Sequence, residues 1–197
     1  MTYRNKLLFL IIGLAGVVLL GRYACYFVDK KYDTIRRPWA YSSDPSKPLL
    51  VGKWQGSVLD PDNNAHEVFL EIEEPLSDEK RKNRFFQKRI KRNRSSRTFF
   101  DGMAILASRG RRDTCEIWGG LDQPDGNQIH FQFRPLHDVH PPGFNLNLAE
   151  GVWQEHQLEL SISFTWFRPD GSSFSDSADP RFEQKGVLKM TRIATAK

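Results

Sequence analysis

The chain has only two cysteines, Cys25 and Cys115, among its 197 residues. So few cysteines exclude a disulfide-stapled scaffold and a four-cysteine zinc site. The sequence also lacks a nucleophile elbow, a P-loop and a Gly-rich dinucleotide motif. Its Asp and Glu residues lie mostly in predicted turns or on polar strand faces, where no two of them form an evident acid–base pair. We therefore expect no catalytic machinery, no metal site and no cofactor.

Helical periodicity is missing after residue 30, and strand periodicity takes its place. Apolar and polar residues alternate in one short segment after another, with turn residues such as Gly, Pro, Asn and Asp between the segments. One face of each segment is apolar and the other polar, as in a sheet with one side on a core. The fold class is therefore all-β, an antiparallel eight-stranded meander closed into a barrel, because closure removes exposed strand edges. The expected strands are 49–59, 67–73, 99–107, 114–121, 127–134, 144–148, 157–167 and 186–193.

The first of these strands has a distinctive pattern of glycines around an indole. Gly52, Trp54 and Gly56 share one face, so we expect a close backbone approach beside the ring. The Gly52-Lys53-Trp54 sequence resembles the Gly-x-Trp motif of the lipocalin and wider calycin barrels. This resemblance implies a lipocalin-like barrel in which Arg192, on the last strand, packs over Trp54 in a structural role. The chain has no counterpart of the family's second motif, a Thr-Asp-Tyr type turn.

A lipocalin-like barrel has an interior that side chains fill or that holds one small ligand. We expect this interior to be lined by apolar side chains that either bind a small apolar ligand or simply fill the core. The candidate ligand-binding residues are Phe131, Phe133, Leu146, Leu160 and Phe164.

One histidine cluster stands in the Pro-rich loop 135–142. His137, Asp138 and His140 would supply part of a metal site or the acid–base groups of a hydrolase or isomerase at the barrel mouth. No HExxH motif or nearby cysteine accompanies them, so the sequence favours a solvated loop and we assign no metal.

An apolar run precedes the barrel. Residues 7–20 are uninterrupted by charge and follow Arg4 and Lys6, and the run extends to about residue 28 if Arg22 reaches the interface. A cleaved signal peptide is the alternative, but the candidate cleavage sequence ending at Ala24 carries bulky residues. We therefore expect an uncleaved N-terminal transmembrane helix over 1–28, a linker over 29–47 and a barrel domain over 48–197. Arg4 and Lys6 favour a non-cytoplasmic barrel, whereas basic residues after the run favour the opposite orientation.

Basic residues concentrate in an insertion at 77–97. Residues 78–97 contain ten Lys or Arg and two Asp or Glu, so this segment has a net charge of +8. The whole chain has a net charge of +5, so the rest of it carries −3. The segment is either a solvated insertion or a contact for anionic lipid headgroups, with nucleic acid the least favoured. The residues expected to contact an anionic surface are Lys80, Arg81, Lys82, Arg84, Lys88, Arg89, Lys91 and Arg92.

Together these patterns indicate a membrane-tethered, lipocalin-like binding or envelope-accessory module without catalytic machinery. Its expected location is the plasma (inner) membrane, through a single span. The alternatives are a structural partner of a membrane-protein complex, contacting it through the anchor and the basic segment, and the barrel-mouth enzyme.

Overall fold

The computed structural model describes residues 3–75, 97–108, 111–136, 142–175 and 179–193, without the side chains of 3–11, 15 and 111. These residues divide into two compact units. The first unit contains α1, and the second contains the described residues from Arg37 onward. Each unit is described by itself below.

The helix α1 runs from Tyr3 to Arg36. Its segment Ile12–Arg36 has 25 residues and is long and apolar enough to cross a membrane. A signal sequence near the N-terminus can have the same length and apolar composition. At a rise of 1.5 Å per residue this segment is about 37 Å long, which exceeds the roughly 30 Å of a hydrocarbon core. The helix continues beyond the anchor boundary expected at residue 28 and takes up the first part of the segment expected as a linker.

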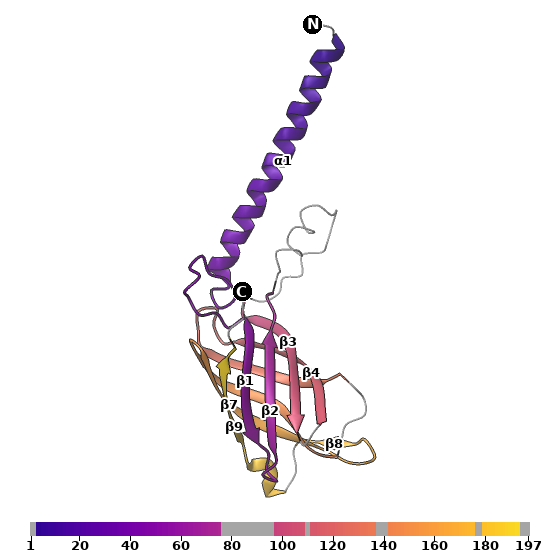
Figure 1. The fold of residues 1–197 in the computed structure, drawn as a ribbon, viewed down its shortest axis with the longest axis vertical. Coiled ribbons are helices and arrows are strands. Elements are labelled where there is room, and N and C mark those ends of the chain that lie inside the picture. The colour runs from indigo at the N-terminus through magenta and orange to yellow at the C-terminus, as the bar shows by residue number, and fades with distance from the viewer. Residues whose placement is uncertain (1–2, 76–96, 109–110, 137–141, 176–178, 194–197) are drawn as a thin grey trace. The chain divides into compact units, whose positions relative to one another are not determined.

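Eight strands form a closed antiparallel barrel, which confirms the predicted fold class (Figure 1). Each strand from β1 to β7 pairs with the next along the chain, and β9 closes the ring by pairing with both β7 and β1. A short strand, β8, adds only to the end of β7. The strands are β1 Gly52–Leu59, β2 Ala65–Ile72, β3 Phe99–Ser108, β4 Arg111–Leu121, β5 Gln128–Pro135, β6 Gly143–Gln154, β7 Gln157–Phe167, β8 Ser173–Phe174 and β9 Gly186–Arg192.

The alternation seen in the sequence places one set of residues inside the ring. Aromatic rings run through this interior in contact: Phe100 lies 6.0 Å from Phe131, and Phe131 lies 5.3 Å from Phe133, between ring centroids. Phe144 and Phe164 make a second such pair at 6.1 Å. All five side chains are buried. The interior is therefore occupied by close-packed side chains, whose burial is the main source of the barrel's stability.

Each end of the barrel is covered by a non-strand segment. Where β1 begins, Trp39 is fully buried, packs 6.0 Å from Phe100 and donates a hydrogen bond from Nε1 to the carbonyl of Arg97 (2.9 Å). At the opposite end lies the short 3-10 helix η1, Pro180–Glu183. Its Phe182 packs against Phe144 with ring centroids 5.4 Å apart. Both ends of the interior are thus shielded from water by aromatic side chains.

Candidate functional site

Trp54 and Arg192 lie opposite each other where the barrel closes, at paired positions of β1 and β9. The indole is fully buried, and its Nε1 donates a hydrogen bond to the carbonyl of Leu50 (2.9 Å). The guanidinium carbon of Arg192 lies 5.7 Å from the centroid of the indole ring. Arg192 also donates to the carbonyls of Leu49 and Val51, the latter at 2.6 Å. Desolvation by burial lowers the pKa of Arg192 below its usual value. The contacts tie the first strand to the last.

The glycines beside Trp54 make this contact sterically feasible. Gly52 has a φ of +134°, and a Cβ there would stand 2.8 Å from Nη2 of Arg192. Such a φ is strained for any residue with a side chain. At Gly56, a Cβ would collide with the backbone carbonyl of Lys189 on β9. The Gly-x-Trp-x-Gly spacing therefore admits both the guanidinium and the neighbouring strand.

The five residues named as candidate ligand contacts all face the barrel interior, where each is at most 6% exposed: Phe131, Phe133, Leu146, Leu160 and Phe164. They belong to one continuous cluster with the other inward-facing side chains. Their surroundings are wholly apolar, so the interior could accept only an apolar molecule. Binding there would require these packed side chains to separate.

Several predicted sites lie outside the described residues. This applies to His137, Asp138 and His140 and to the eight basic residues between 80 and 92. Among the residues that are described, no three His, Cys, Asp or Glu side chains are grouped so that they could hold a metal ion. Cys115 is buried between strands, and desolvation, with a smaller contribution from Asp113, raises the pKa of its thiol to about 12. A thiol with that pKa is a packing group rather than a nucleophile.

A buried carboxylate organises the turn between β1 and β2. Asp60 is 6% exposed and accepts hydrogen bonds from the backbone amides of Asp62 and Asn64 and from the Asn64 side chain. His66 Nε2 lies 3.1 Å from its Oδ2. Burial raises the pKa of Asp60, but the hydrogen bonds from Asn64 and His66 outweigh this effect and lower it below the usual 3.8. The carboxylate is thus a structural group at the base of the barrel.

We expect Asp60→Asn to lower the free energy of unfolding by about 1–3 kcal/mol near neutral pH, because charge-assisted hydrogen bonds are lost in a buried turn. The folded pKa is lowered, so the ionised carboxylate stabilises the fold above the unfolded pKa of 3.8 and stops doing so as the pH falls through the lower folded pKa. The difference between parent and variant should shrink near pH 3. Urea unfolding at the two pH values measures it, with the exposed Asp125→Asn as control. An equal difference at both pH values would contradict the role given to the charge.

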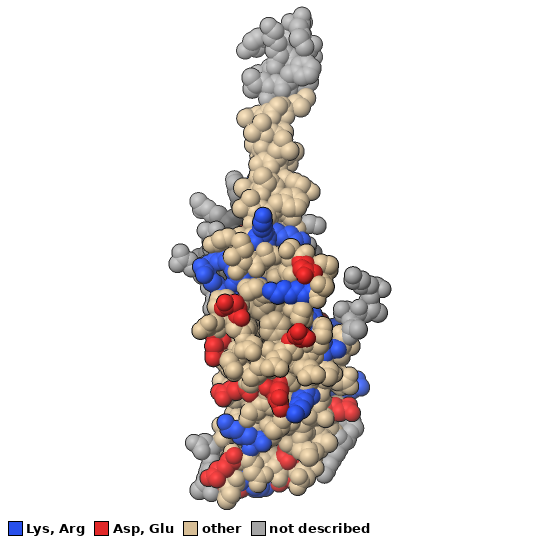
Figure 2. Space-filling view, turned by 90° about the vertical axis from the view of Figure 1, so that its left-hand side faces the viewer, with Lys and Arg blue, Asp and Glu red and all other residues tan. Residues whose placement is uncertain are grey.

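The outer surface of the barrel contains a feature that was not predicted from the sequence. Most strands are polar on the outside, and acidic and basic side chains are interspersed on the side that carries β7 and β9 (Figure 2). The outside of β3 is different, because Phe99, Met103 and Ile105 all point outward. The signal was present in the sequence, since 99–107 is apolar at both parities of the alternation and not at one alone.

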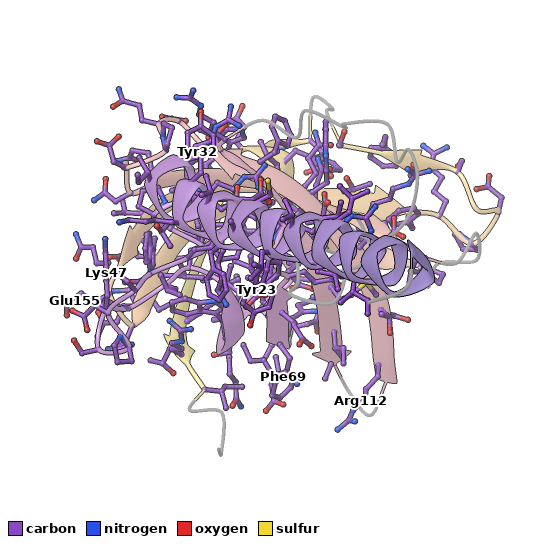
Figure 3. All side chains as sticks on the ribbon, turned by 90° about the horizontal axis from the view of Figure 1, so that it is seen from above. Tyr23, Tyr32, Lys47, Phe69, Arg112 and Glu155 are labelled. Atoms are coloured by element: carbon purple, nitrogen blue, oxygen red, sulfur yellow. The ribbon has the colours of Figure 1, made fainter. Side chains whose placement is uncertain are left out.

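Two open cavities flank the outward side chain of Met103, which lines both. The first has a volume of about 310 Å³, and its labelled lining residues Phe69 and Arg112 point away from the barrel on the same side (Figure 3). The second has a volume of about 620 Å³ and is lined by the indole of Trp118, which is 57% exposed. Three carboxylates, Glu73, Asp101 and Glu116, line this second cavity as well. Both are open grooves lined mainly by outward-facing residues of the strands.

Together these features define a closed antiparallel β-barrel with a filled core, of the general architecture seen in lipocalins. The same chain also contains an apolar helix. No protein-family model matches the chain, and no curated protein sequence matches it. Among solved structures, it is similar to a de novo designed fluorescence-activating β-barrel, at 12% identity and a TM-score of 0.40, covering 73% of this chain and 93% of that one. It is also similar to EF1p2_mFAP2b bound to DFHBI, at 15% identity and a TM-score of 0.44, covering 73% and 94%. Likenesses of this size say nothing about a ligand of the present chain, and the barrel is defined by its own strand pairing.

Proposed function

We propose that this protein is a membrane-tethered β-barrel binding module, anchored by α1 and without catalytic machinery. The observation that carries the proposal is α1 itself. Leu14, Val17 and Leu20 are each more than 60% exposed, and nothing in a soluble protein would favour leaving such a run in water. Burying these side chains in lipid would stabilise the helix in a membrane, since the backbone groups between the first and last turns of a helix are hydrogen-bonded within it.

We also propose that the barrel is a lipocalin-like scaffold on the non-cytoplasmic side of the plasma (inner) membrane. The contact between Arg192 and Trp54 supports the lipocalin-like assignment, and Arg4 and Lys6 ahead of the apolar run support the orientation. A rigid, filled barrel is suited to presenting its outer surface to a partner. An anionic lipid surface remains a proposed contact of the basic residues between 80 and 92.

A second candidate function is the binding of a small apolar ligand inside the barrel. Its support is the apolar lining formed by the five interior residues named above. The ring contact between Phe131 and Phe133 favours the first proposal, because a preformed ligand site would leave those rings apart.

We expect the full-length chain to stay with the membrane pellet after an alkaline carbonate wash. Leu14→Arg combined with Val18→Arg should move most of it to the soluble fraction, because a charge at the centre of a span costs about 2.5–3.5 kcal/mol by insertion scales. Both side chains are more than half exposed on α1, so the barrel should keep its melting temperature. The matched control places arginine at Leu59 and Val187, which are similarly exposed on the barrel.

The same pellet distinguishes an anchor from a cleaved signal by intact-mass measurement. A full-length mass supports the anchor. A shorter species beginning near residue 23 or 25, or a parent chain released by the wash, would show that α1 is not a permanent tether.

A further inference from the structure

Large apolar side chains gather on the outer face of β2, β3 and β4. Phe69 on β2 stands beside Ile105 on β3 in the strand register, and Met103 is the next outward residue along β3. Phe99 and Trp118 extend the patch, with ring centroids 5.1 Å apart. Solitary exposed apolar residues are ordinary, but a contiguous group of large ones marks an interaction surface. We call these five residues the β2–β4 patch.

Charge is distributed unevenly around this patch. Near its Phe69 and Ile105 part, the carboxylate of Glu71 is paired with Lys53 at 3.6 Å. Around Trp118, in contrast, Glu73, Asp101 and Glu116 line the larger groove, and among the described residues none of the three forms an ion pair. Arg134, opposite Glu116 in the register of β4 and β5, is the one basic residue among the described side chains that line that groove, and it too forms no ion pair with them.

The chemistry of the larger groove matches a cation. Unpaired carboxylates attract a positive charge, and the exposed face of an indole adds a cation–π attraction. The smaller groove is lined by Phe69, Met103 and Ile105 as well as by Arg112 and the paired Lys53 and Glu71, and its apolar part matches an apolar side chain. Asp101 lies at the larger groove and Ile105 at the smaller one, four residues apart on β3, so the two grooves are about 13 Å apart. An occupant would thus carry a cation and a large apolar group at this separation.

We propose that the β2–β4 patch docks a segment of a partner protein that carries Lys or Arg a few residues from a large apolar side chain. The proposal rests on the proposed function, in which the barrel is a scaffold for binding, and it names the chemistry of the partner. In an extended segment, four residues span the distance between the two grooves. The cation lies against Trp118 and the carboxylates, while the apolar side chain fills the groove beside Phe69.

Two other occupants fit less well. An anionic lipid surface would be repelled by the carboxylates around Trp118. A second copy of this chain, stacked on the patch with its strands aligned, would place the carboxylates of Glu71 and Glu116, which flank Met103 in the register, against each other. Both become outcomes of the test below.

The test is a selection from a phage-displayed library of random linear peptides on the full-length chain held in detergent micelles. The enriched peptides should share Lys or Arg spaced about four residues from Phe, Leu, Ile or Trp. One enriched peptide is then synthesised, and its affinity is measured by fluorescence anisotropy. Affinity should fall as salt rises from about 0.1 M towards 1 M, because exposed charges are screened.

Two double variants decide where the peptide binds. Trp118→Ser with Glu116→Gln alters the larger groove and should weaken binding by roughly tenfold or more, the equivalent of about 1.4 kcal/mol. The matched control, Val187→Ser with Glu159→Gln, removes one exposed apolar side chain and one carboxylate from β9 and β7 and should bind like the parent. Trp118 and Glu116 are exposed, so both variants should keep the parent's melting temperature. A Trp118 variant that melted early would be replaced by Glu73→Gln with Asp101→Asn, which keeps the indole.

The outcomes separate clearly. Enrichment of basic–apolar peptides that bind the groove variant more weakly supports the proposal. No enrichment, enrichment without cations, or equal binding to both variants overturns it. Binding of the parent to anionic vesicles that is lost in the groove variant would assign the patch to a lipid surface, and dimerisation of the parent alone in sedimentation would assign it to a second copy.

Peptide binding does not depend on anchoring, so a chain that is washed from membranes yet binds these peptides would overturn the tether and leave the docking surface standing.

Discussion

Replacing Trp54 by alanine is expected to lower the free energy of unfolding by about 3–5 kcal/mol, as for large aromatic truncations in a core. The side chain is fully buried, and its removal leaves a cavity while also depriving the Leu50 carbonyl of its donor. It further exposes the guanidinium of Arg192, which lies over the ring, to an empty space. A loss of this size is a large share of the roughly 5–15 kcal/mol that stabilises an ordinary domain.

Urea unfolding followed by far-UV circular dichroism measures the effect, since the indole fluorescence changes in the variant. Trp118→Ala is the matched control, because that indole is 57% exposed and its loss should cost less than about 1 kcal/mol. A Trp54 variant within about 0.5 kcal/mol of the parent would mean that the ring does not pack at the closure of the barrel.

Phe131→Ala should cost a similar amount, about 3–5 kcal/mol, if the interior is a filled core. Phe131 is 1% exposed and lies in ring contact with both Phe100 and Phe133. Its deletion removes the central member of that row, and neighbouring strands cannot move inward without breaking their ladders. Phe69→Ala, on the outside of the same barrel, should cost far less and serves as the control.

The Phe131 variant also separates the two candidate functions. A barrel that holds a ligand has room around its lining, so truncating one lining residue would cost little in the ligand-free protein. A loss below about 1 kcal/mol, together with thermal stabilisation of the parent by a small apolar molecule, would favour the interior ligand site. A large loss with no such stabilisation of the parent favours the scaffold.

The barrel could be predicted from the sequence because each strand encodes its own inward face. Alternation with a period of two depends on local geometry and needs no knowledge of the partner strand. It fails where that geometry changes. In β6 the register shifts between Leu146 and Ala149, so two inward residues are separated by two others. The strand was therefore expected to end at residue 148, although it continues to Gln154.

Features that depend on contacts between residues far apart in the sequence could not be predicted from the local alternation. Trp39 stands in an aperiodic, Pro-containing segment that predicts a linker, yet it covers one end of the interior because Phe100 lies beneath it. The packing of η1 over the opposite end likewise depends on a contact between residues far apart in the sequence. The guanidinium carbon of Arg181 lies 5.3 Å from the centroid of the Phe144 ring. The β2–β4 patch is intermediate. Its apolar residues on β3 were evident in the sequence, but only the strand register brings Phe69 and Trp118 beside them.

The pairing of β1 with β9 has a consequence for how the protein is made. A ring whose first and last strands are neighbours cannot close until β9 has been synthesised, because β9 follows the other strands of the ring along the chain. Until then β1 and β7 each present an unpaired edge, which invites strand addition by another chain. Pairing across such a long stretch of sequence is also slow to form. The interval between emergence of β1 and arrival of Arg192 is therefore the period in which the nascent protein is most exposed to aggregation.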